Sequence, residues 1–220
     1  MKGYSGKFYP FGLVCLVALM IAVFIPFTQV SADSLSDTGQ TKCYDNGGEI
    51  PCPTPCEDCF GQDAQYESQT PRSYTKLGES GVVLSDAATQ EEGWIMTRDN
   101  VTGLVWEIKT AANENNKYTW DDANTYATNL TLGGRAWRMP TVQELQTLGN
   151  YGSFLVLDPK WFPHHPLCWA STRCALWPEY LAWRSDGASS YDQNVTDDYV
   201  DEFGTLEHVE FNVRAVSDGS

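Results

Sequence analysis

The cysteines are the residues whose spacing points most directly to chemistry. The chain has seven, and six of them follow position 40. An even number of closely spaced cysteines predicts short-range disulfides in an exported chain, although the connectivity stays open. A zinc site is the alternative, but there is one Cys-x-x-Cys pair and the remaining spacing does not fit a zinc ribbon. The disulfides that we predict are Cys43–Cys52, Cys56–Cys59 and Cys168–Cys174.

Carboxylates and amides concentrate in a stretch near the C-terminus. Ca²⁺ prefers about six to eight hard oxygen ligands of these types. The spacing matches no EF-hand loop, so a solvated acidic loop is the competing interpretation. The candidate calcium ligands are Asp192, Asn194, Asp197, Asp198, Asp201 and Glu202.

Tryptophans also gather in the later half of the chain. An exposed indole offers a flat, amphipathic face to a ligand such as a sugar ring, whereas burial in the core is the competing interpretation. Trp177 is the one that we expect to be exposed, because Pro178 follows it. The candidate ligand-binding residues are Trp177, Trp169 and Trp183.

The N-terminus has the pattern of a cleavable export signal. Lys2 and Lys7 precede an apolar run, and the small residues at 30–32 predict cleavage after Ala32. The apolar run is shorter than a spanning helix and is interrupted by Pro26, so we predict no membrane span after cleavage. The expected location is secreted, periplasmic or at the cell surface.

Composition limits the partners of the mature chain. The formal charge is −15 over 220 residues, and loss of two lysines with the signal makes it −17. Such a charge repels phosphate backbones, so we predict no nucleic-acid partner. The sequence contains no Gly-x-Ser-x-Gly, His-Glu-x-x-His or phosphate-loop motif. We therefore predict no enzymatic activity, no catalytic residues and no cofactor, with calcium as the one ligand ion to consider.

The elements that must position these residues begin after a polar segment. Residues 33–80 contain few large apolar side chains and are predicted to form an extended, disulfide-stapled arm. Residues 81–220 form the predicted domain. Two short β-prone runs, 94–97 and 104–108, flank a turn and predict a hairpin.

Two helices are predicted next, and each has a cap. Thr119 with Asp122 begins the first, whose apolar stripe runs from Trp120 to Leu130. Thr141 with Glu144 begins the second. Short strands near 168–171 and 180–183 follow, and the alternation in 209–214 predicts a half-buried terminal strand. This order predicts an α+β domain.

Four blocks of this sequence resemble a known family. They are Asp99–Trp106 (DNVTGLVW), Tyr118–Ala123 (YTWDDA), Trp137–Leu145 (WRMPTVQEL) and Tyr151–Gly152. Together they resemble the Lcl C-terminal domain family, formerly DUF1566, and weaker similarity extends the resemblance over roughly residues 41–216. In its central block we interpret Arg138 as the partner of a nearby carboxylate.

The resemblance implies a C-type-lectin-like fold, with two helices on a small twisted antiparallel sheet and a long loop region. It also implies a non-catalytic binding or adhesion module that recognises an extracellular glycan or protein through that loop region. The family's namesake adhesin binds sulfated glycosaminoglycans, which the charge of −17 disfavours here. The alternatives are an enzyme similar to formylglycine-generating enzymes and a structural subunit of an envelope or extracellular assembly. A homo-oligomer is also among the partners to consider.

Overall fold

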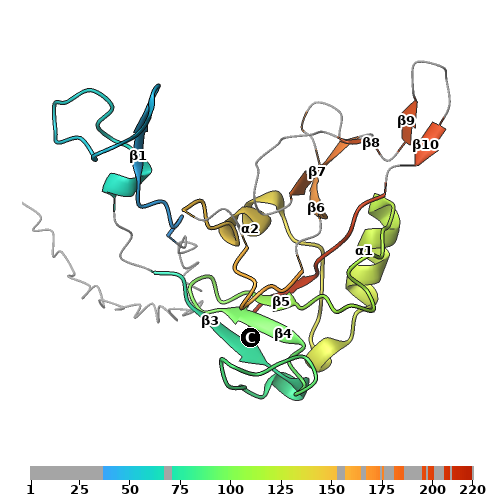
Figure 1. The fold of residues 1–220 in the computed structure, drawn as a ribbon. Helices are drawn as coiled ribbons and strands as arrows, with labels where there is room; N and C mark the ends of the chain where they lie inside the picture. The colour runs from blue at the N-terminus through green and yellow to red at the C-terminus, as the bar shows by residue number, and fades with distance from the viewer. Residues whose placement is uncertain are drawn as a thin grey trace, which may run out of the picture. The chain divides into compact units, whose positions relative to one another are not determined.

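The computed structural model describes residues 37–66, 71–152, 157–164, 167–173, 175, 181–185, 195–196, 198–200, 206–208 and 210–219. Within them the fold mixes two short α-helices with small antiparallel sheets, which is compatible with the α+β prediction. The central sheet has four strands in the order β11-β5-β4-β3, and β3, β4 and β5 lie side by side (Figure 1). Their bounds are β3 Tyr74–Leu77, β4 Met96–Asp99, β5 Val105–Glu107 and β11 Val216–Ser217.

The predicted hairpin is confirmed as β4 and β5. Met96 pairs with Glu107 and Arg98 with Val105. The turn between them is closed by the Asp99 carboxylate, which accepts hydrogen bonds from the backbone N–H groups of Val101 and Thr102. This is the turn chemistry for which an aspartate is suited.

Both predicted helices are present and capped. In α1, Trp120–Asn129, the Thr119 hydroxyl accepts a hydrogen bond from the backbone N–H of Asp122. In α2, Val142–Thr147, the bonds are reciprocal, because the Glu144 carboxylate also accepts from the Thr141 N–H at 2.7 Å. The apolar faces are buried as the spacing predicts, with Ala123 and Ala127 fully inside.

The remaining elements are short. The described residues form three 3₁₀ turns, η1 Asp63–Gln65, η2 Glu79–Gly81 and η3 Leu132–Gly134. The strands predicted near 168 and 180 are confirmed as neighbours in a sheet of order β6-β7-β8. Their bounds, with those of the two remaining hairpins, are β6 Cys168–Arg173, β7 Leu181–Ser185, β8 Val195–Thr196, β9 Asp198–Val200, β10 Leu206–His208, β1 Cys43–Asp45 and β2 Gly48–Ile50.

Two predictions about the fold are wrong. The core-forming region begins before Gly81, because β3 pairs with β4 and Leu77 is 1% exposed. The alternation in 209–214 also forms no strand among its described residues. Phe211 and Asn212 make isolated bridges, and Arg214 is buried, because the C-terminal segment crosses the core before it reaches β11.

Among the described residues, the core comprises two packed groups of buried side chains. The first includes Met96 and Trp169, and the second includes Trp106 and Phe162. Tyr74 contacts the second group edge-on, with its ring centroid 5.4 Å from that of Phe162. Thus β3, although predicted to belong to the arm, provides one wall of the core.

Candidate binding pocket

A pocket of about 590 Å³ lies beside β3. Three segments line it: the strand itself, the loop at 86–94 and the segment at 159–164. Pockets of ligand-binding size typically combine apolar walls with a few polar groups. Here the apolar walls include Trp94, Pro159 and Pro163, and the polar groups include Lys76 and Lys160.

Lys76 is the buried charge of this pocket. Period-two alternation along β3 places it on the same face as Tyr74. Lys76 is 5% exposed, and its ammonium donates a hydrogen bond to the Ala88 carbonyl at 2.8 Å. The ammonium also lies 3.7 Å from the centroid of the Trp94 ring, a cation–π contact. Burial lowers the pKa of Lys76, and the nearby Lys160 ammonium lowers it further.

The loop at 86–94 has a fixed shape because its own groups close it. The Glu92 carboxylate accepts from the Thr89 N–H at 2.8 Å, and the Trp94 N–H donates to the Thr89 carbonyl. Gly93 adopts φ +91°, a conformation that side chains disfavour. The Trp94 indole N–H then donates to the Met96 carbonyl at 3.0 Å. The wall of the pocket is therefore preformed.

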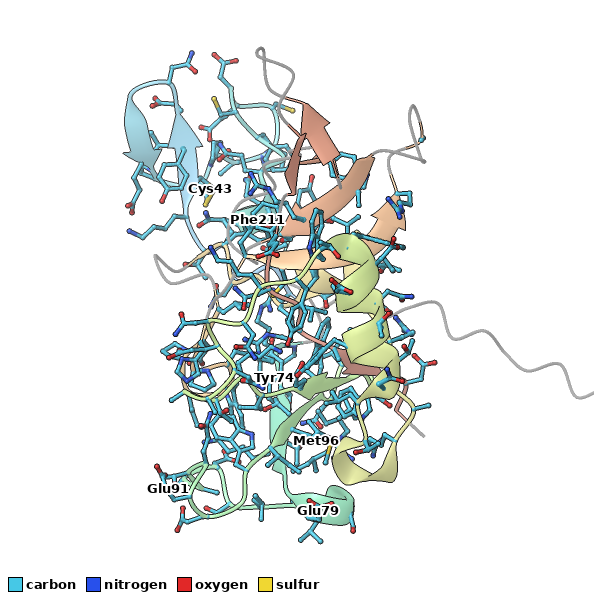
Figure 2. All side chains as sticks on the ribbon, turned by 90° about the vertical axis from the view of Figure 1, so that its right-hand side faces the viewer. Cys43, Tyr74, Glu79, Glu91, Met96 and Phe211 are labelled. Carbon is cyan, nitrogen blue, oxygen red and sulfur yellow. A yellow bond between two sulfur atoms is a disulfide. The ribbon has the colours of Figure 1, made fainter. Side chains whose placement is uncertain are left out.

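Two acidic side chains, Asp86 and Glu91, also line the pocket. Asp86 forms an ion pair with Lys160 at 3.4 Å, and both side chains are more than half exposed. Glu91 lies at the outer edge of the same loop (Figure 2). Solvent screens such exposed pairs, so they contribute little to stability. Of the charged side chains that line this pocket, Lys76 is the one that is buried.

A second group of buried charges begins at Glu107, the last residue of β5. Glu107 and Lys109 are each 1% exposed and pair at 2.8 Å. The same carboxylate oxygen accepts from the Tyr126 hydroxyl at 2.5 Å, and the other oxygen accepts from the Ala215 N–H at 3.0 Å. Burial and the Glu107 charge raise the pKa of Tyr126, so it remains a donor. These bonds connect β5, α1 and the C-terminal segment.

Arg214 connects this group to the pocket wall. It is 1% exposed and donates to the Glu107 carbonyl at 2.9 Å and to the His164 carbonyl. His164 in turn contacts the Glu114 carboxylate through its Nδ1. The segment at 159–164 is therefore held in part by a half-buried hydrogen bond from the C-terminal segment.

One family model matches this chain. It describes the Lcl C-terminal domain and matches residues 95–217. The chain belongs to the Lcl C-terminal domain family. Neither a curated protein nor a solved structure matches it significantly. Lys76 and Trp94 precede the matched region, so the pocket combines side chains from before and within the Lcl C-terminal domain.

The Arg138 interpretation is confirmed in this Lcl C-terminal domain. Its guanidinium holds Glu144 with two hydrogen bonds of 2.9 and 2.7 Å and contacts Asp218 at 2.7 Å. The hydrogen bond to Glu144 raises the pKa of Arg138. Burial alone would raise the pKa of Glu144, but hydrogen bonds from Arg138 and Thr141 bring it below its usual value. Arg138 thus joins α2 to the C-terminal segment.

The described tryptophans of the predicted ligand set do not form an exposed platform. Trp169 is fully buried, donates from its indole to the Tyr118 carbonyl at 2.8 Å and packs edge-on against Phe211. Trp183 is half-buried and packs against the second core group. Trp177 lies outside the described residues. For Trp169 the structure agrees with the competing interpretation, burial in the core, and its neighbours Cys168 and Ala170 in β6 are buried too.

The predicted calcium ligands fall almost entirely outside the described residues. Asp198 belongs to β9, whose backbone alone is described, and the others lie beyond the described ranges: Asp192, Asn194, Asp197, Asp201 and Glu202. Among the described residues, no cluster of three His, Cys, Asp or Glu side chains could hold a metal ion. In the same part of the chain, no helix is long and apolar enough to cross a membrane.

The predicted disulfides have three different outcomes. Cys43–Cys52 is confirmed and closes the β1–β2 hairpin. Cys56 and Cys59 are exposed, unpaired thiols in the structure, which differs from the predicted bond. They lie in successive turns, closed by Glu57 N–H to Thr54 O and Phe60 N–H to Glu57 O. Cys168 is described, but Cys174 lies outside the described residues.

Sequence reasoning missed Lys76 as a functional candidate. A lysine in a polar segment is usually solvated, and its neighbours in 33–80 provide few apolar side chains. The sequence feature that could have indicated a strand is the two-residue spacing of Tyr74 and Lys76, which places both on one face. Burial of the ammonium follows from contacts with loops that are distant in sequence, and no local pattern encodes those contacts.

Proposed function

We propose that this chain is an exported, non-catalytic binding module that recognises an extracellular glycan or protein. The pocket beside Lys76 is the observation that carries the proposal, because it is preformed and contains a buried charge and apolar walls. The long loop region, which we expect to add contacts, lies mainly outside the described residues. The acidic composition and the export pattern at residues 1–32 support an extracellular role.

The finer fold assignment is also part of this proposal. We assign a C-type-lectin-like arrangement, preceded by a disulfide-stapled arm. Support comes from the two capped helices α1 and α2, the small antiparallel sheets and the Cys43–Cys52 bond in the arm. Binding modules commonly place variable loops on such a rigid scaffold.

The environment of Cys168 supports a binding function over catalysis by a cysteine. Burial raises the pKa of the Cys168 thiol to about 11, although the charges of Arg214 and Lys109 act in the opposite direction. A raised pKa disfavours the thiolate, which is the reactive form of a cysteine. The structure therefore favours an inert role for this sulfur.

The test is an array of glycans and extracellular matrix proteins, probed with the purified mature protein. Ala87 is exposed and lines the pocket, so Ala87→Trp should fill it without removing a core contact. Ala111→Trp, at an exposed alanine outside the pocket lining, is the matched control. We expect the Ala87→Trp variant to lose array binding and the control to retain it.

A chelator arm separates the pocket from the acidic loop. Binding that survives both tryptophan variants but disappears with chelator would transfer the function to a calcium site in the loop region. Array binding that is absent in the wild-type protein, or that all variants retain in the presence of chelator, would refute the proposed pocket function.

A further inference from the structure

We propose that the pocket beside Lys76 takes a single carboxylate carried on an apolar body. This inference rests on the proposed binding function and adds the chemistry of the ligand. It depends on the unusual state of one ammonium group and on the character of the walls around it.

The Lys76 ammonium has one N–H group that no acceptor among the described residues uses. An ammonium carries three N–H groups. One is used by the Ala88 carbonyl at 2.8 Å, and the face of Trp94 at 3.7 Å occupies another direction. The centroid of the Trp161 ring lies farther away, at 5.9 Å, and accepts no hydrogen bond from the ammonium. Among the described residues, no further acceptor contacts the ammonium. The remaining N–H is thus available to a ligand in the pocket that Lys76 lines.

Lys76 also has no counter-ion among the described residues. Asp86 and Glu92 raise its pKa from a distance, but each has a closer partner. Asp86 pairs with Lys160 at 3.4 Å, and Glu92 accepts from the Thr89 N–H. A desolvated ammonium without a carboxylate is unfavourable, and an anionic ligand would relieve this cost. The missing partner is therefore an anion.

The surrounding charges select a monoanion. Glu91 and Glu92 are exposed on the loop that borders the pocket, Lys160 already pairs with Asp86, and the chain as a whole carries −15. These charges repel a phosphate dianion or a sulfated polymer more strongly than a single carboxylate. A carboxylate can approach the ammonium while its uncharged remainder faces the acids.

The apolar lining of the pocket indicates that the rest of the ligand is apolar. Trp94, Pro159 and Pro163 present rings, and Ala87 and Ala88 present methyl groups. Burying apolar surface against such walls contributes roughly 25 cal/mol per Å². An aromatic or aliphatic group one or two bonds from the carboxylate would reach them.

Calorimetric titration of the mature protein tests this inference with two matched pairs of probes. Phenylacetate and phenylacetamide represent a free small acid, and acetyl-glycyl-phenylalanine and its C-terminal amide represent a peptide terminus. We expect each acid to bind in the ~millimolar range or tighter, and each amide at least about 10-fold more weakly. The arm with the tighter acid identifies the source of the carboxylate.

Substitutions connect the binding to the proposed site. Lys76→Met keeps an unbranched chain against Trp94 and should weaken acid binding about 10- to 100-fold, with little effect on the amides. The control is Lys117→Met, at an exposed lysine outside the pocket lining. Should Lys76→Met misfold, Ala87→Trp provides the same test, because it blocks the pocket and leaves Lys76 in place.

The outcomes separate this inference from the proposed function. Equal binding of acids and amides, or no binding of either, overturns the carboxylate assignment even if the array ligand is still lost in Ala87→Trp. Failure of both the array and the titrations refutes both proposals. Acid binding that persists in Lys76→Met shows that another group holds the anion and also overturns the inference.

Discussion

The Glu107→Gln substitution should destabilise the protein more than any exposed charge change. Glu107 receives hydrogen bonds from Lys109 and Tyr126 on one oxygen and from the Ala215 N–H on the other. Glutamine retains one acceptor oxygen, so its amide NH₂ must face a donor on one side. Lys109, which is 1% exposed, then loses its counter-ion.

The expected loss can be estimated from these contacts. Breaking a buried ion pair by removing one partner costs about 3–5 kcal/mol. An orphaned buried donor costs roughly 1–3 kcal/mol, which is consistent with that range. We therefore expect the free energy of unfolding to fall by about 4 kcal/mol, and Tm to fall by roughly 10 °C for a chain of this size.

Urea unfolding followed by tryptophan fluorescence measures this change, with circular dichroism as the second probe. Glu79→Gln, on the exposed η2 turn, is the control and should leave the midpoint unchanged. The double variant Glu107→Leu/Lys109→Met replaces both charges with apolar groups and should recover part of the loss. A loss below about 1 kcal/mol for Glu107→Gln would refute the argument that this pair is buried and mutually dependent.

The remaining predictions concern pH and thiol chemistry. The folded-state pKa of Glu144 is below its unfolded value of about 4.3, so its contribution to stability is complete above that pH and is lost as pH falls through the folded pKa. Glu144→Gln should therefore reduce the acid dependence of Tm between about pH 5 and 3, whereas an unchanged slope would show that Arg138 does not stabilise the carboxylate. Native alkylation without reductant should label Cys56 and Cys59, which are exposed thiols, and a peptide map that links these two cysteines would contradict the structure.

The local elements were predictable because local chemistry determines them. Thr141 and Glu144 form the capping box that their spacing indicates, and α2 starts where the cap requires. The hairpin of β4 and β5 follows from two β-prone runs and an aspartate turn. In each case the stabilising groups lie within a few residues of one another.

Contacts between distant segments were not predictable in this way. Arg214 follows an alternating pattern that predicts exposure, yet it is buried because it reaches the Glu107 and His164 carbonyls. Lys76 is buried for a similar reason, by the loop that contains Ala88 and Trp94. A single sequence records the residue types but not which loop covers which strand.

The burial of these basic side chains changes the charge that the rest of the chain presents. Three basic residues are buried among the described residues, Lys76, Lys109 and Arg214, and the buried acids there are Asp99 and Glu107. The remaining chain, including its surface, is therefore more acidic than the formal charge of −15 alone suggests. A polyanion meets repulsion at every approach, because exposed acids act over about a Debye length of 8–10 Å. A buried ammonium acts at contact, where water is excluded and its interaction is strongest. The selection of a small monoanion that we propose for this acidic protein rests on this difference in range.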